Sequence, residues 1–157
     1  LNVVGELSLV AGAPGLVGGQ VVDLECEGKE VDLETLEYIH LHKTGALLKA
    51  CVRTGAMIAG ANEELLKALT TYAEGIGLAF QIIDDILDLT SSSEKLGKTA
   101  GKDLLADKTT YPKLLGMEES KKRAFDLVDQ AKKAIEPWGL NAKYLISLAD
   151  FITNRDR

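Results

Sequence analysis

The sequence predicts an all-α protein, a single bundle of long helices. Apolar residues recur at steps of three and four over most of the 157 residues, which is the spacing of one helix face. Alternating apolar and polar runs, which would indicate strands, are scarce. The chain is long enough for one domain with a sizeable core, and it contains no sequence repeat.

The beginning of the chain predicts two helices. Apolar residues at helical spacing give a short amphipathic helix at the start. The sequence GAPGLVGG (12–19) breaks it, and Pro14 is placed to begin a new helix that runs through Cys26. The sequence EGKE (27–30) predicts a turn before the next element.

A third helix is expected to begin after Asp32, a good N-cap residue. Its apolar positions step mostly by three and four, but Thr44 and Gly45 interrupt the pattern and weaken or kink a helix there. The small residues GAMIAGAN (55–62) end it.

The longest predicted helix begins after Asn62 and extends for about 28 residues, through Thr90. Gly75 and Gly77 within it would let a neighbouring backbone approach closely. The polar stretch that follows, 91–110, predicts a loop, and long loops inside compact domains are often functional.

The remaining chain predicts three more helices. Pro112 opens a short one. The segment 118–136 is amphipathic with a charged outer face, PWG (137–139) is a turn, and 141–155 forms the final helix.

Composition excludes several classes of protein. The net charge is −6 and aromatic residues are 5%, so neither a basic arm nor a base-stacking surface indicates nucleic acid. Cys26 and Cys51 are too few for a disulfide framework, and no spacing suggests zinc. We expect no transmembrane segment and see no signal pattern. The first residue, Leu1, is not a methionine, which fits a processed or truncated product.

The clearest candidate for chemistry is the sequence FQIIDDILDLT (80–90). Asp84 and Asp88 are four positions apart on one helical face, Gln81 lies one turn earlier, and Asp85 is offset around the axis. Oxygen donors stacked in this way suit a hard divalent cation such as Mg²⁺. The alternative is a solvated acidic stripe, which the apolar residues on both sides disfavour.

Other polar residues lie in unusual contexts. Lys98 and Lys102 follow in a glycine-containing segment and are placed to hold a diphosphate, although a solvated loop explains them equally well. Lys43 and Thr44 lie at the helix interruption, where backbone carbonyls are freed.

Two more pairs of polar residues have simpler explanations. Gln20 and Asp23 form a polar pair inside an apolar helix, which fits a buried network between helices. His40 and His42 point in different directions, so they are not expected to bind one metal together.

Five segments in this order closely resemble the short-chain trans-prenyl diphosphate synthases, a family that includes farnesyl and geranylgeranyl diphosphate synthases. The resemblance runs from about Val10 to Arg155, and the sequence of these segments is most like that of the cyanobacterial and plastid geranylgeranyl diphosphate synthases. The segments are GQVVD (19–23), HKTGALL (42–48), GLAFQIIDDILD (77–88), GKTAGKD (97–103) and TYPKLLG (110–116).

The resemblance implies the helical bundle of isoprenoid synthases, usually as a homodimer. It implies a prenyltransferase that uses Mg²⁺ to condense an allylic diphosphate with isopentenyl diphosphate, in isoprenoid and carotenoid precursor biosynthesis. A bacterial cytoplasm or a plastid stroma is the location that it implies.

It also implies roles for individual residues. Asp84 and Asp88 would bind Mg²⁺, with Asp85 in the same cluster. Lys43 and Lys98, with Lys102 nearby, would bind the allylic diphosphate. The Thr44 carbonyl and Gln81 would stabilise the allylic cation. Phe80 would line the isopentenyl site, and Gln20 and Asp23 would shape the site beside the metals.

The chain departs from the family in one respect. The first aspartate-rich motif and the Gly-Lys-Arg segment that binds isopentenyl diphosphate are not in this sequence. Both belong to an N-terminal half, so the resemblance covers the C-terminal half of a synthase domain, and we expect residues 1–157 alone to be inactive. Two alternatives are a non-catalytic regulatory subunit of a heteromeric synthase and a plain helical bundle, which leaves the five ordered segments unexplained.

Overall fold

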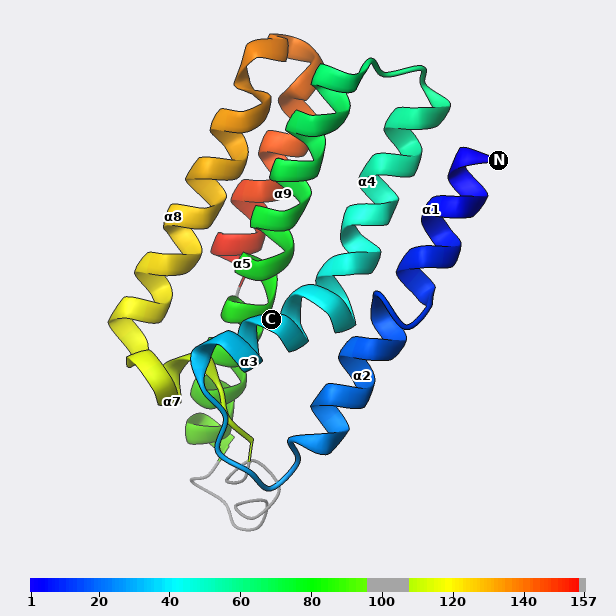
Figure 1. Ribbon diagram of the computed structural model, residues 1–157. Helices are drawn as coiled ribbons and strands as arrows, with labels where there is room; N and C mark the ends of the chain where they lie inside the picture. The colour runs from blue at the N-terminus through cyan, green and yellow to red at the C-terminus, as the bar shows by residue number, and fades with distance from the viewer. Residues whose placement is uncertain (96–107, 156–157) are drawn as a thin grey trace.

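The computed structural model describes residues 1–95 and 108–155, and every regular element in these ranges is a helix, so the all-α prediction is confirmed (Figure 1). The elements are α1 (Asn2–Ala11), α2 (Leu16–Glu25), α3 (Leu33–Ile39), the π-helix η1 (His40–Gly45), α4 (Ala46–Ile58), α5 (Glu63–Lys95), α7 (Tyr111–Leu115), α8 (Met117–Ile135), the 3₁₀ segment η2 (Glu136–Ala142) and α9 (Lys143–Asn154).

The helix starts predicted after Asp32 and Asn62 are confirmed by their caps. The Asp32 carboxylate accepts a hydrogen bond from the Thr35 backbone N–H at 2.8 Å, and the Asn62 side-chain oxygen accepts one from the Leu65 N–H at 2.9 Å. The loop prediction was wrong for 91–95, which continue α5. Extending a formed helix by one more turn adds a hydrogen bond per residue and needs no new nucleus.

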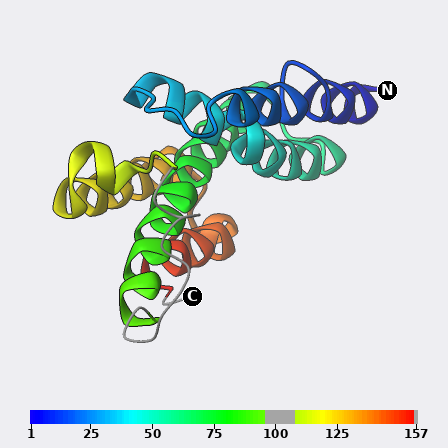
Figure 2. The same ribbon diagram turned by 90° about the horizontal axis from the view of Figure 1, so that it is seen from below.

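Helix α5 is the centre of the bundle. Figure 1 shows α8 on one side of it and α4 with the N-terminal helices on the other. Helix α9 also packs against α5, on the side away from α8 in Figure 2. The predicted close approaches occur at both glycines. A Cβ at Gly75 would lie 3.1 Å from the Ala131 Cβ of α8, and one at Gly77 would lie 3.2 Å from the Gly45 Cα. The fully buried core includes Tyr72, Ala73, Ala79 and Ile82 of α5 and Ala124, Val128, Ala131 and Ile135 of α8.

The interruption predicted at Thr44 and Gly45 is the π-helix η1. It lies between two helices that approach it through glycine. A Cβ at Gly19 of α2 would be only 2.3 Å from the Lys43 backbone nitrogen, and Gly77 of α5 meets Gly45 on the other side. The π-helix is rare in proteins, and its single turns occur frequently at functional sites. This backbone irregularity therefore places Lys43 and Thr44 between α2 and α5.

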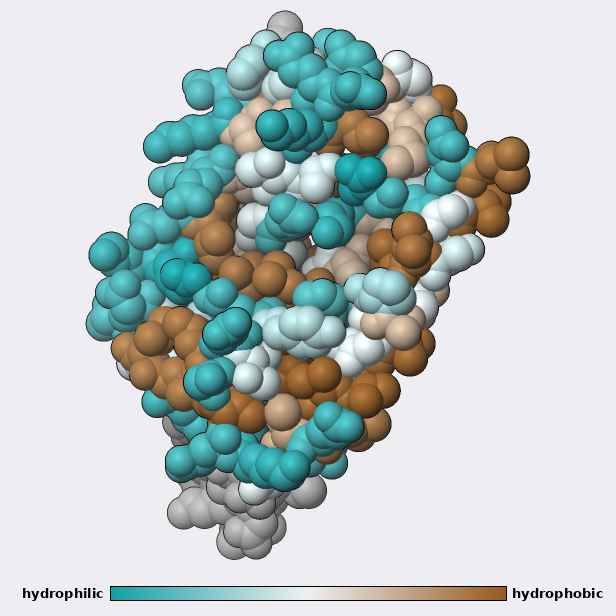
Figure 3. Space-filling model, in the orientation of Figure 1, coloured by the Kyte–Doolittle hydropathy of each residue, from teal (hydrophilic) through white to brown (hydrophobic). Residues whose placement is uncertain are grey.

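Helices α1 and α2 are unusually apolar on the outside. We expected no transmembrane segment, but residues Asn2–Glu25 are, by length and composition alone, apolar enough to cross a membrane. Core helices of soluble proteins and signal sequences pass the same test. The stretch is also broken into two helices, because a tight turn brings Gly15 against the Val10 carbonyl. Figure 3 shows apolar side chains along this edge of the molecule. Val4, Leu9 and Val17 are among the exposed apolar residues of the two helices.

Candidate functional site

One face of α5 carries the predicted cation site. Gly77, Gln81, Asp84 and Asp88 follow one another at steps of three and four, so they form a single stripe along the helix. The stripe begins where Gly77 packs on η1 and ends at Asp88, which is exposed. Gln81 Nε2 donates a hydrogen bond to Asp84 Oδ2 at 3.2 Å. The structure thus brings Gln81 and Asp84 together and places Asp88 one turn further out.

Asp85 points away from this stripe into the core. Its Oδ2 lies 3.2 Å from His40 Nε2 and accepts a hydrogen bond from the Tyr111 backbone N–H at 3.0 Å. The His40 and Tyr111 rings are stacked with centroids 5.7 Å apart. The expected membership of Asp85 in the metal cluster therefore does not match its side chain, which is buried and already bonded. Among the described residues no group of three His, Cys, Asp or Glu side chains is placed to hold a metal ion.

The two histidines diverge, as predicted. His40 is buried against Asp85, whereas His42 stacks on Tyr38 at 3.9 Å and its Nδ1 lies 2.8 Å from the Tyr38 carbonyl oxygen. The network around Asp85 continues through the Tyr111 hydroxyl, which donates to Glu37 at 2.7 Å. It therefore ties α3, η1, α5 and α7 together behind the stripe.

Asp84 forms an ion pair with Arg155, which the sequence did not predict. Arg155, directly after α9, donates from Nη2 to Asp84 Oδ1 and to the Phe80 carbonyl oxygen, the latter at 3.0 Å. Burial raises the pKa of Asp84, and the nearby charges of Asp88 and Asp85 raise it further; the bond and charge of Arg155 lower it only in part. No spacing signal could have found Arg155, because 71 positions separate it from Asp84.

Lys43 is held by Asp23, a predicted neighbour in the site. Lys43 Nζ lies 2.6 Å from Asp23 Oδ2, and Lys108 Nζ lies 3.3 Å from Asp23 Oδ1. Burial alone would raise the pKa of Asp23, but the hydrogen bond to Lys43 and the charges of both lysines outweigh it and lower that pKa below its ordinary value of 3.8. The carboxylate thus fixes two ammonium groups in one place.

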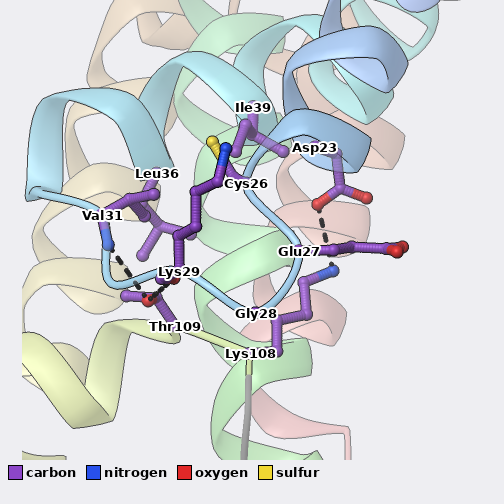
Figure 4. A pocket seen from close by; sticks show the side chains of 10 residues that line it. All are labelled: Asp23, Cys26, Glu27, Gly28, Lys29, Val31, Leu36, Ile39, Lys108 and Thr109. Carbon is purple, nitrogen blue, oxygen red and sulfur yellow. Dashed lines mark hydrogen bonds and ion pairs between the residues drawn. The ribbon is translucent and has the colours of Figure 1, made fainter.

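A cavity of about 330 Å³ lies beside this cluster. Figure 4 shows Asp23 and Lys108 facing each other at one side of it, with Leu36 on the other. Of the predicted site residues that the structure describes, only Asp23 lines this cavity, so the carboxylate stripe of α5 lies outside it.

The other predicted residues are distributed as follows. Thr44 lies on η1, half-buried, next to Lys43. Phe80 is half-buried beneath Arg155, whose guanidinium carbon is 4.0 Å from the centre of its ring. Gln20 is half-buried on α2. Lys98 and Lys102 lie outside the described residues.

The residues of the stripe fit a divalent cation in donor chemistry. Mg²⁺ is typically bound by one or two carboxylates, with waters and substrate phosphates completing the octahedron. Asp84 and Asp88 supply two carboxylates on one face, and the half-exposed Asp84 side chain is reachable from solvent. Asp85 is not needed for such a site.

The described fold and site define an all-α protein with a carboxylate stripe along α5 and a lysine–aspartate cluster at a π-helix. The chain belongs to the polyprenyl synthetase family, whose model matches residues 7–137.

Three curated relatives illustrate its similarity to known proteins. A dimethylallyltranstransferase of Fischerella ambigua is 56% identical over 99% of this chain and 45% of its own length. A chloroplastic geranylgeranyl pyrophosphate synthase of Capsicum annuum is 52% identical over 99% of this chain and 43% of its own length. The farnesyl diphosphate synthase of Escherichia coli is 45% identical over 100% of this chain and 54% of its own. The chain therefore spans about half the length of the relatives that it matches.

Solved structures agree with this assignment. An apo FPP/GFPP synthase from Zymomonas mobilis superposes with a TM-score of 0.80 at 36% identity, over 96% of this chain and 50% of that one. A geranyltransferase from Helicobacter pylori, complexed with magnesium and isoprenyl diphosphate, has a TM-score of 0.77 at 30% identity, over 98% of this chain and 50% of that one.

Proposed function

We propose that the protein containing this chain is an Mg²⁺-dependent prenyltransferase. It would condense allylic diphosphates with isopentenyl diphosphate to give geranylgeranyl or farnesyl diphosphate, a precursor for isoprenoids and carotenoids. The observation that carries the proposal is the stripe of Gln81, Asp84 and Asp88 on α5, which begins at the π-helix bearing Lys43 and Thr44, in a chain of the polyprenyl synthetase family.

The reaction would break the C–O bond between the allyl group and its diphosphate, whose oxygen keeps the electron pair. A C–C bond then forms from the double bond of isopentenyl diphosphate, and a proton is lost. Mg²⁺, when bound, supplies positive charge that stabilises the leaving diphosphate. Asp84 and Asp88 would hold the ion, and Lys43 would bind diphosphate oxygens together with Lys98 and Lys102.

Gln81 is suited to face the allylic cation. A carboxylate only accepts hydrogen bonds, so the Gln81 side chain must turn its NH₂ group toward Asp84 Oδ2. Its amide oxygen is then directed away from Asp84 and presents lone pairs to a positive centre. The Thr44 carbonyl on η1 would do the same, since a π-helix shifts the hydrogen-bond register of its carbonyls. Phe80 would line the isopentenyl site, and Gln20 and Asp23 would shape the pocket around Lys43.

We further propose that residues 1–157 are the C-terminal part of a single synthase domain. Relatives are about twice as long, and the apolar outer face of α1 and α2 is what a packed partner segment would cover. Intact mass of the protein purified from its source tests this. A mass near 16.9 kDa would contradict it. We propose a homodimer or heteromer in a bacterial cytoplasm or plastid stroma, in line with the bacterial and chloroplastic names of the relatives.

The activity is tested with the protein at its natural length. Product formation from geranyl or farnesyl diphosphate plus isopentenyl diphosphate and Mg²⁺ is measured for wild type and for Asp84→Ala. We expect turnover to fall by at least about a thousandfold, since the leaving charge loses its metal. Asp126→Ala, at an exposed carboxylate of α8, is the matched control and should leave turnover unchanged. An inactive wild type that activates a second synthase subunit would instead support the regulatory alternative.

A further inference from the structure

Arg155 occupies the side of Asp84 that a metal ion would need. Its Nη2 donates to Asp84 Oδ1, while Gln81 donates to Asp84 Oδ2. Both oxygens of this carboxylate are therefore engaged by groups of the protein itself. Figures 1 and 2 show the end of α9, from which Arg155 follows, beside α5.

A guanidinium and a divalent cation bound to the same carboxylate repel each other, because both are positively charged. The Arg155 side chain is only 10% exposed, so the repulsion between the two cations would be weakly screened by water. A cation at Asp84 and Arg155 in its present position therefore compete for the same negative charge.

The contact is built so that it can open. Arg155 uses one nitrogen for both of its hydrogen bonds, whereas the strongest arginine–carboxylate pairs use two. Its Nε is buried without a partner among the residues that the structure describes. The Arg155 backbone is extended, with φ −72° and ψ 146°, so the residue lies outside α9.

Helix α9 itself is held independently of this contact. Lys132 of α8 bonds Asp150 at 2.7 Å, and the Tyr72 hydroxyl of α5 donates to the Leu145 carbonyl oxygen at 2.7 Å. Arg155 can therefore leave Asp84 without any unfolding of α9.

We propose that Arg155 is the resident counter-ion of Asp84 and that a divalent cation binds Asp84 by displacing it. This inference rests on the proposed role of Asp84 as a metal ligand. Arg155 is a positioning residue that sets the affinity for the metal. Because its guanidinium covers the face of the Phe80 ring at 4.0 Å, the same displacement uncovers Phe80 and couples metal binding to the proposed isopentenyl site.

The first test measures Mn²⁺ binding to the natural-length protein by calorimetry, with and without inorganic diphosphate. We expect Arg155→Gln to bind Mn²⁺ about tenfold more tightly than wild type, since a charge-assisted hydrogen bond and a tenfold change in affinity are of similar size. Arg155→Lys, which keeps the charge, should lie between the two. Lys143→Gln removes one exposed positive charge from the first residue of α9, at the opposite end of the helix from Arg155, and should match wild type. Unchanged or weaker binding in Arg155→Gln overturns the inference.

The second test follows Arg155 itself by NMR during titration with Mg²⁺. The Phe80 ring current should shift the Arg155 side-chain signals, and saturating Mg²⁺ should move them to the values of an exposed arginine. Mn²⁺ binding that Asp84→Asn removes, with Arg155 signals that do not move, overturns the inference and leaves the metal site standing. Mn²⁺ binding that Asp84→Asn does not weaken, or no binding in any variant, overturns the metal role of Asp84 and the inference with it.

Discussion

The carboxylate of Asp85 accepts a hydrogen bond from the backbone N–H of Tyr111 at 3.0 Å, across 26 positions of the chain. The same oxygen lies 3.2 Å from His40 Nε2. Asp85 thereby joins α5 to the start of α7 and to η1, and its side chain points away from that of its neighbour Asp84. Adjacent carboxylates in one sequence motif thus have different tasks, one facing the proposed metal and one anchoring the backbone.

Asp85→Ala should destabilise the fold by about 2 kcal/mol, because it leaves the buried Tyr111 N–H without its acceptor. Asp85→Asn keeps an oxygen acceptor and should cost clearly less. Urea unfolding measures both. The matching functional expectation is that Asp85→Asn retains Mn²⁺ binding that Asp84→Asn loses. Equal loss in the two variants would show that Asp85 is a metal ligand after all.

Local chemistry made part of this fold predictable. Asp32 and Asn62 cap helices through their own side chains, and Thr44–Gly45 are weak helix formers wherever they stand. The type of irregularity was not predictable. That the interruption becomes a π-helix depends on the backbones of α2 and α5, which reach it at Gly19 and Gly77.

The candidate site likewise contains features that the sequence could predict and features that it could not. The i, i+4 spacing of Asp84 and Asp88 is a property of one helix, so it could be read directly. Arg155 and Lys108 join the site from distant parts of the chain, and their partners are fixed only by how α9 and the segment after 107 pack. The sequence likewise could not show that Asp85 faces inward, because that depends on Tyr111 and His40.

Gly19→Ala tests the close contact between α2 and η1. The added methyl would lie 2.3 Å from the Lys43 backbone nitrogen, so the helices must separate, at a cost of about 1–3 kcal/mol. The control is Gly5→Ala on α1, where nothing lies within 4 Å of the new Cβ and the helix should gain up to about 1 kcal/mol. Thermal unfolding of both variants gives the comparison, and a Gly19→Ala variant as stable as wild type would contradict the packing.

Tyr72→Phe tests the link between α5 and α9. The fully buried Tyr72 hydroxyl donates to the Leu145 carbonyl oxygen at 2.7 Å, so its removal should cost about 1 kcal/mol of unfolding free energy. Tyr144→Phe deletes a hydroxyl at a tyrosine that is 76% exposed and should be neutral. If the two variants unfold at the same urea concentration, the Tyr72 hydrogen bond contributes nothing to the free energy of unfolding.

The lowered pKa of Asp23 makes its contribution to stability depend on pH in a definite direction. A carboxyl whose pKa is lower in the folded state stabilises the fold above its ordinary value of 3.8, and the stabilisation disappears as the pH falls through the lowered value. Asp23→Asn should therefore be less stable than wild type at pH 7, by about 1 kcal/mol because Lys43 is partly exposed to solvent. The difference should shrink steadily below pH 3.8.

Urea unfolding of wild type and Asp23→Asn between pH 7 and pH 2.5 measures this difference, since the other carboxylates are common to both proteins and cancel. Asp126→Asn, at an exposed position of α8, controls for the loss of one negative charge and should show a smaller difference from wild type at pH 7. A gap between wild type and Asp23→Asn that stays constant with pH would mean that the stabilising contacts of Asp23 with Lys43 and Lys108 do not depend on its charge. The two ammonium groups would then be held by packing alone.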